Sequence, residues 1–123
     1  CPDHWIGAGD RCYRVFTQET SWEKAEYNCM QHGYVAHLAT VTSDEGNEHI
    51  VELSQIYQQD LWIGLNRRQE HSLFEWTSGK DVQYTNWAPG EPNSHNETED
   101  CVITSTDFKW HDYSCSYTMA SIC

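Results

Sequence analysis

Positive charge is scarce in this chain. The chain contains seven Lys and Arg residues and nineteen Asp and Glu residues, and its formal net charge is −12 at pH 7. Because an acidic surface is repelled by phosphate backbones and by anionic lipids, nucleic acid is excluded as a partner, and cations are favoured. Mean hydropathy is −0.75, and no run of about 18 apolar residues is present, so we expect no membrane insertion.

Short cysteine knuckles of the kind that bind zinc are also absent. The six cysteines of a chain this short instead predict disulfides and an oxidising, extracellular compartment. Six cysteines permit about 15 pairings, so this reasoning leaves the connectivity open. The sequon at Asn96 agrees with secretion, and since no signal sequence opens the chain, we expect a secreted protein to have lost it already.

Signatures of catalysis are missing as well. The sequence contains no nucleophile elbow, no zinc-protease helix and no phosphate-binding loop. Glu91 and Glu99 form a carboxylate pair of the kind that glycoside hydrolysis uses, but they are better explained as metal ligands. We therefore expect that the protein is not an enzyme.

Two capping boxes predict two helices in a single domain that spans residues 1–123. Thr20 is the expected N-cap of the first helix, which stops near Gly33, and residues 42–45 open the second. The expected inward stripes are Trp22, Ala25 and Cys29 in the first helix, and Ile50, Leu53 and either Ile56 or Tyr57 in the second.

Short strands account for most of the remaining regular structure. Residues 61–65 are continuously apolar, which predicts a central strand buried on both faces. Further strands are predicted at 5–6, 12–16, 74–76, 101–104 and 108–110, with a last strand ending at 123. These elements define an α+β class with two helices and short antiparallel strands, while residues 78–98 form a long irregular region of the kind that is often functional.

Hard oxygen ligands gather at the end of that irregular region. The four side chains are those of Glu91, Asn93, Glu99 and Asp112. Carboxylate and amide oxygens are the ligands that Ca²⁺ prefers, at about six to eight per ion. The segment therefore predicts a loop built around calcium.

Short motifs are spread over the whole chain: Cys1-Pro2-Asp3-x-Trp5, Ser21-Trp22-x-x-Ala25 leading to Cys29, Trp62-Ile63-Gly64-Leu65, Glu91-Pro92-Asn93, Glu99-Asp100-Cys101, Trp110-x-Asp112 and the terminal Cys123. With these motifs in this order, the chain resembles a C-type lectin-like carbohydrate-recognition domain over its whole length. This resemblance implies the C-type lectin-like fold, with two helices, short antiparallel sheets and a long calcium-binding loop. It also implies three disulfides, Cys1–Cys12, Cys29–Cys123 and Cys101–Cys115.

The resemblance also implies a site and a specificity. Lectins of this family carry a cis bond before the proline of Glu-Pro-Asn, so Glu91 and Asn93 would face one calcium ion together with Glu99 and Asp112. Glu-Pro-Asn is associated with equatorial 3- and 4-hydroxyls, as in mannose, N-acetylglucosamine and fucose, whereas galactose-type members carry Gln-Pro-Asp. The expected partners are therefore mannose-type or N-acetylglucosamine-containing glycans.

One residue departs from the family pattern. Where the family has Trp-Asn-Asp, this chain has His111, and nitrogen is a poor ligand for Ca²⁺. Two interpretations stay open: either His111 hydrogen-bonds the sugar while water or backbone fills the metal shell, or the site binds calcium weakly or not at all. The same four ligand residues, with His95, His111 and Tyr113, are the candidate sugar contacts.

A second calcium would need acids after residue 65, where Arg67 and Arg68 stand instead. We therefore expect one calcium, and a solvated turn at the two arginines. The resulting hypothesis is a secreted, calcium-dependent lectin, with a role in innate recognition by resemblance, and a homodimer or higher oligomer for avidity. The alternative is a non-sugar member of the family that binds a protein partner.

Overall fold

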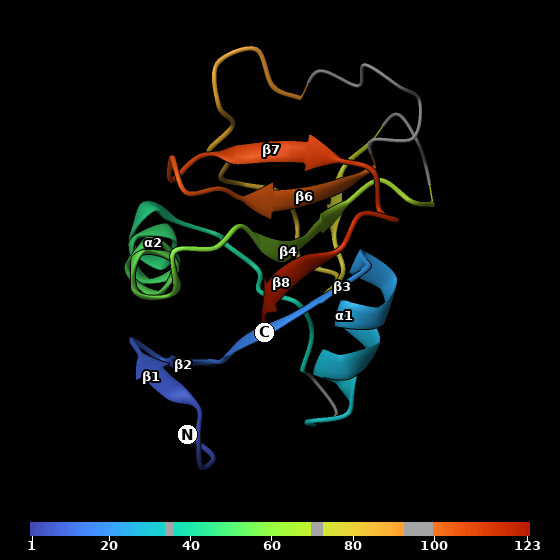
Figure 1. The fold of residues 1–123 in the computed structure, drawn as a ribbon. Coiled ribbons are helices and arrows are strands. Elements are labelled where there is room, and N and C mark those ends of the chain that lie inside the picture. Colours follow the sequence, from blue (N-terminus) through green and yellow to red (C-terminus); the bar gives the residue numbers. More distant parts are fainter. Residues whose placement is uncertain (34–35, 70–72, 93–99) are drawn as a thin grey trace.

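The computed structural model describes residues 1–33, 36–69, 73–92 and 100–123 (Figure 1). The elements are β1 Ile6–Ala8, β2 Arg11–Tyr13, β3 Val15–Thr20, α1 Trp22–Met30, α2 Asp44–Tyr57, β4 Leu61–Asn66, β5 Glu75–Trp76, β6 Cys101–Thr104, β7 Trp110–Tyr113 and β8 Met119–Ile122. A two-stranded sheet pairs β1 with β2 near the N-terminus, and a larger sheet has the strand order β3-β8-β4-β6-β7, with β5 paired to β4.

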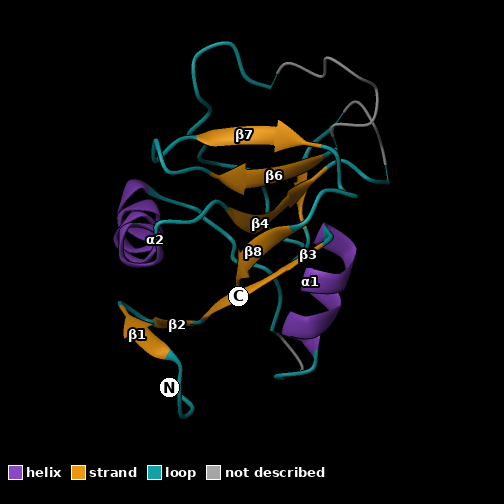
Figure 2. Ribbon diagram, in the orientation of Figure 1, coloured by secondary structure: helices purple, strands orange, loops and turns teal. Residues whose placement is uncertain are grey.

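The predicted α+β class is confirmed, and the sheet is mixed because β4 and β8 run parallel. Figure 2 shows the two helices on opposite sides of the larger sheet. No helix among the described residues is long and apolar enough to cross a bilayer.

Strand β4 separates two halves of the core, as its apolar run predicts. Leu61, Ile63 and Leu65 pack into the cluster that includes Ile50 of α2, while Trp62 packs into the cluster around Trp22 of α1. Successive side chains of a strand point to opposite faces, so both faces of β4 are covered. The indole N–H of Trp22 also donates to the Ile63 carbonyl at 2.8 Å, which ties α1 to this strand.

Both helices begin one residue later than the capping boxes predict. Ser21 caps α1 by accepting from the Lys24 amide at 3.4 Å, since Thr20 is the last residue of β3. Ser43 caps α2 through the Gly46 amide at 3.1 Å. The first stripe is correct, and Trp22, Ala25 and Cys29 are all buried.

The predicted end of the inward stripe of α2 is wrong. Ile50 and Leu53 are buried, but Ile56 is 71% exposed and Tyr57 is 38% exposed. Ile56 lies about 240° around the helix from Ile50, away from the core. Tyr57 is the last residue of the helix, which the chain leaves at the left-handed Gln58.

Strand boundaries differ most from the predictions in the N-terminal strands and before β7. The N-terminal hairpin consists of Ile6–Ala8 and Arg11–Tyr13, and the predicted second strand divides so that Val15–Thr20 joins the larger sheet. β7 begins at Trp110 rather than at 108, because Phe108 takes a positive φ of 66° in the turn after β6. That turn is closed by the Ser105 amide, which donates to the Lys109 carbonyl at 2.9 Å.

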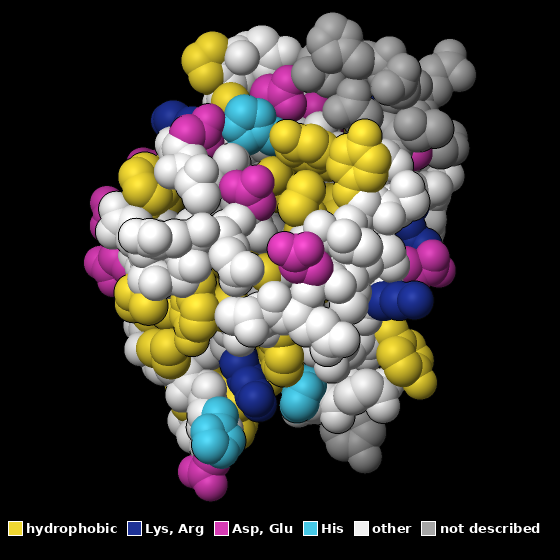
Figure 3. All heavy atoms as spheres, in the orientation of Figure 1, with side chains coloured by type: hydrophobic (Ala, Val, Ile, Leu, Met, Phe, Trp, Pro, Cys, Tyr) yellow, Lys and Arg dark blue, Asp and Glu magenta, His cyan; other side chains and the backbone are white. Residues whose placement is uncertain are grey.

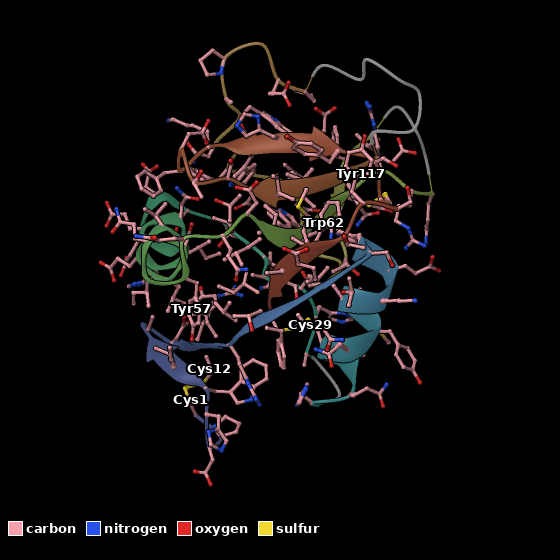
Figure 4. The ribbon with its side chains drawn as sticks, in the orientation of Figure 1. Cys1, Cys12, Cys29, Tyr57, Trp62 and Tyr117 are labelled. Carbon is pink, nitrogen blue, oxygen red and sulfur yellow. A yellow bond between two sulfur atoms is a disulfide. The ribbon has the colours of Figure 1, made fainter. Side chains whose placement is uncertain are left out.

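All three disulfides that the resemblance implies are present, and among the described residues no cysteine is free. Cys29–Cys123 joins α1 to the end of the chain after β8, Cys101–Cys115 joins the start of β6 to the turn after β7, and Cys1–Cys12 closes the N-terminal hairpin. Figure 4 labels Cys1, Cys12 and Cys29.

Candidate functional site

The loop that carries Glu91 is fixed against β7. Figure 1 shows residues 77–92 as a yellow-to-orange loop that rises past β7. Trp110 donates its amide to the Asn86 carbonyl at 2.9 Å, and its own carbonyl accepts from the Ala88 amide at 3.0 Å. The rings of Trp87 and Trp110 meet edge to face at 5.9 Å. Trp110 is fully buried, so the loop is anchored on the core.

The peptide bond between Glu91 and Pro92 is cis, as the resemblance implies. Glu91 also donates its amide to the Ala88 carbonyl at 2.9 Å. Its carboxylate Oε2 accepts a hydrogen bond from the Asp112 amide at 3.1 Å. Side chain and backbone therefore both hold Glu91 between the loop and β7.

The carboxyl groups of Glu91 and Asp112 lie together. Asp112 is 2% exposed. Burial, and then a hydrogen bond with the Asp112 side chain, raise the pKa of Glu91 above its ordinary value, although the Asp112 amide and His111 act in the opposite direction. Two neighbouring acidic side chains form a donor set in which a cation fits, and their oxygens suit calcium.

Arg67 brings a fixed positive charge to the same region. Its Nε lies 3.2 Å from Asp100 Oδ1, and its Nη2 lies 3.9 Å from Asp112 Oδ2. The Arg67 amide donates to the Asp100 carbonyl at 2.8 Å, and the guanidinium lies over the Phe74 ring at 4.8 Å. The expected solvated turn is therefore wrong at this residue, whose side chain is only 12% exposed.

His111 is held between two acids. Its Nε2 lies 2.8 Å from Asp107 Oδ2, and its Nδ1 lies 3.8 Å from Glu91 Oε2. Burial would raise the pKa of Asp107, but hydrogen bonds from His111 and from the Lys109 amide lower it overall. Asp107 was not foreseen from the sequence, and the only signal was its spacing of four residues before His111.

The other predicted site residues divide into two groups. Tyr113 follows Asp112 directly on β7 and is half-buried. Asn93, His95 and Glu99 lie outside the described residues, so their part in the site stays a prediction. Within the described part of the chain, no three His, Cys, Asp or Glu side chains are gathered as a metal site.

The fold and the loop geometry define the C-type lectin class of domain. Residues 18–123 match the family model described as Lectin C-type domain, and the chain belongs to that family. Domains of this family commonly bind Ca²⁺, and the family is generally non-enzymatic. C-type lectin domain homologues of this chain bind carbohydrates.

Three similar proteins illustrate the range of the family. A C-type lectin of Micrurus corallinus is 33% identical over 129 residues, which cover 100% of this chain and 82% of that protein. The cow CD23 carbohydrate-recognition domain, solved in the presence of GlcNAc2Man3 oligosaccharide, is 30% identical with a TM-score of 0.91, over 100% of this chain and 93% of the other. A calcium-independent type II antifreeze protein is 31% identical with a TM-score of 0.90, over 100% of this chain and 92% of the other.

Proposed function

We propose that residues 1–123 act as one calcium-dependent carbohydrate-recognition domain for mannose-type, N-acetylglucosamine or fucose-type glycans. The observation that carries the proposal is the pairing of the Glu91 and Asp112 carboxyl groups beside the cis Glu91–Pro92 bond. Glu91, Asn93, Glu99 and Asp112 would hold one calcium ion. When bound, calcium supplies coordination positions for two adjacent sugar hydroxyls.

The chain's own residues set the orientation of the sugar. The Glu91 carboxylate only accepts hydrogen bonds, whereas an asparagine amide at position 93 also donates. That asymmetry favours hydroxyls with the equatorial arrangement of the mannose 3- and 4-positions. His111 is already engaged by Asp107 at 2.8 Å, so it would contact the sugar from a fixed position.

A single calcium is proposed because Arg67 stands where a second ion would need acids. Its guanidinium already neutralises Asp100 at 3.2 Å. The proposal also includes an extracellular location, since disulfides persist in oxidising compartments. Single sugar sites bind weakly, so we include a homodimer or larger oligomer in the proposal. A role in innate glycan recognition completes it.

Calorimetric titration tests the proposal directly. Mannose, N-acetylglucosamine and galactose are titrated into the protein in Ca²⁺ and again in EDTA. We expect mannose and N-acetylglucosamine to bind in Ca²⁺ but not in EDTA. Galactose should bind in neither. Glu91→Gln keeps the shape of the side chain and removes one charge, so it is expected to weaken calcium and sugar binding by about 10–100-fold.

The matched control is Glu52→Gln, which removes one charge from an exposed position on α2 and should bind like the parent. Galactose binding equal to mannose binding would contradict the specificity. Sugar binding that persists in EDTA would contradict the role of calcium.

A non-sugar function is the second candidate. Two observations favour it: the similarity to a calcium-independent antifreeze protein, and the Arg67 guanidinium 3.9 Å from Asp112, where it competes with a metal for that carboxylate. Retention on immobilised mannose with release by EDTA discriminates the two functions. Failure to bind any of the three sugars would favour a protein partner instead.

A further inference from the structure

A pocket opens at the end of the domain away from β7. It lies between the N-terminal hairpin, the segment that follows α1 and the end of the chain after β8, and Figure 1 shows these three parts together at the lower end of the molecule. Its volume is about 320 Å³. Pockets for small ligands measure about 300–1,000 Å³, so this one has room for a ligand of one or two rings.

The inner lining of this pocket is apolar and belongs to the core. Leu38, Ala39 and Cys123 line it, and all three are buried. The Ala39 amide donates to the Ile122 carbonyl at 2.9 Å, and Cys123 is bonded to Cys29 of α1. Walls that are part of the packed core are in place before a ligand arrives, which lowers the cost of binding.

Aromatic side chains complete the lining. Trp5 and His32 both line the pocket, and their rings meet edge to face with centroids 5.9 Å apart. Tyr13 also lines it and is 3% exposed. Burial raises the pKa of Tyr13, while the charge of Arg11 lowers it and that of Asp10 raises it. The Tyr13 hydroxyl therefore stays protonated at neutral pH and can donate a hydrogen bond.

The charge of the lining is opposite to that of the chain. The chain has nineteen acidic side chains and only seven Lys and Arg. The lining that the structure describes nevertheless contains Arg11, His32 and His37, and no Asp or Glu. Figure 3 shows a Lys or Arg side chain beside a histidine at the lower end of this face, next to hydrophobic side chains. The pocket therefore favours a ligand with a negative charge.

Arg11 supplies the charge that is free to meet such a ligand. His37 is already held by the Glu26 carboxylate at 2.8 Å, and Arg67 pairs with Asp100 at 3.2 Å. Arg11, in contrast, forms an ion pair with none of the described residues. A guanidinium binds a carboxylate through two parallel hydrogen bonds, which makes it selective for that group.

We propose that this pocket binds a small aromatic carboxylate, with the ring of the ligand against Trp5 and Tyr13 and its carboxylate on Arg11. Aromatic rings pack on one another edge to face or offset, and the buried walls favour an apolar ring. The net charge of the chain opposes an anion only weakly here, because charges more than about 8 Å away are screened at physiological salt. The site requires neither calcium nor sugar, and it is separate from Glu91 and Asp112.

An NMR titration of the backbone amides tests this site, with indole-3-acetate as the probe at neutral pH. We expect amides of the lining, such as those of Cys12 and Ala39, to shift and to saturate with a Kd of about 1 mM or below. Tryptamine has the same ring system but a positive charge. Because it would meet Arg11 with a like charge, it should bind at least about tenfold more weakly.

Two variants and a control locate the binding. Arg11→Gln removes the charge and should weaken binding of indole-3-acetate by about tenfold or more. Ala36→Phe adds a ring at a lining position and should abolish binding while it leaves Arg11 in place. The matched control is Arg14→Gln, because Arg14 lies over the Phe16 ring at 4.7 Å and lines a different pocket beside β3. It should bind like the parent.

The outcomes decide the proposal. Equal affinity for indole-3-acetate and tryptamine, or an unchanged affinity in Arg11→Gln, would overturn the role of Arg11. Shifts confined to amides outside the lining, or full affinity in Ala36→Phe, would overturn the site itself. The amide spectrum of each variant also reports whether it is folded, and if Arg11→Gln does not fold, Ala36→Phe and the comparison with tryptamine still decide.

Discussion

Replacing Cys29 and Cys123 together by alanine is expected to lower the free energy of unfolding by about 5 kcal/mol. The two cysteines are 94 residues apart in sequence, so their disulfide closes most of the chain into one loop. Loop-closure entropy grows with the logarithm of that separation, and the unfolded state of the variant regains it. Total stabilities of domains are about 5–15 kcal/mol, so a loss of this size leaves the protein marginal at best.

Urea unfolding followed by tryptophan fluorescence measures this loss. The matched control is the double alanine variant of Cys1 and Cys12, which are 11 residues apart. The same relation gives about 3 kcal/mol for that loop. Cys29 is also completely buried, so its replacement disturbs packing as well. Equal losses in the two variants, or a larger loss at the N-terminal hairpin, would show that loop closure does not control the stability of this chain.

Local patterns predicted those parts of the fold that depend on local physics. The apolar run 61–65 identified β4, because a strand covered on both faces has no polar positions. The predicted inward stripe of α1 is confirmed, because Trp22, Ala25 and Cys29 repeat at helical spacing. The start of α1 is displaced by one residue, since Thr20 and Ser21 can both cap a helix and the pairing of β3 with β8 places Thr20 in the strand.

The candidate site was less accessible to such reasoning. The Glu91–Asp112 pairing followed from the family resemblance, which supplies the tertiary contact that spacing alone cannot give. Arg67 was assigned to a solvated turn because nothing in its neighbourhood indicates Asp100, which lies 33 residues further along the chain. Phe108 was assigned to a strand because its apolar side chain gives no sign of a left-handed backbone. Contacts between distant segments and unusual backbone angles are the features that residue patterns do not encode.

Gly64→Ala is expected to destabilise the protein by about 3 kcal/mol, because β4 passes very close to the segment before α2. A Cβ added at Gly64 would lie 2.8 Å from the Leu38 carbonyl oxygen, 3.1 Å from that of Ala39 and 3.0 Å from Thr77 Cγ2. Two of these atoms belong to the backbone and cannot rotate away. The Gly64 amide also donates to the Ala39 carbonyl at 2.9 Å, and the clash would strain this bond.

The neighbouring segment has little freedom to give way. The Leu38 amide donates to the buried Glu26 carboxylate at 2.9 Å, and the same carboxylate accepts from His37 at 2.8 Å and from the Thr77 hydroxyl. Moving Leu38 away from a new methyl group would therefore weaken hydrogen bonds to a buried charge, which are among the stronger ones.

Gly46→Ala is the matched control for the same chemical change. Its new Cβ would meet the Ser43 hydroxyl at 3.5 Å, an ordinary contact, inside helix α2. Because alanine favours the helix and restricts the unfolded chain, this variant should be more stable than the parent by about 0.5–1 kcal/mol. Urea midpoints at unchanged slope should therefore move in opposite directions for the two variants. A Gly64→Ala midpoint within error of the parent would mean that β4 and residues 38–39 separate easily, and that the close approach does not fix β4 against that segment.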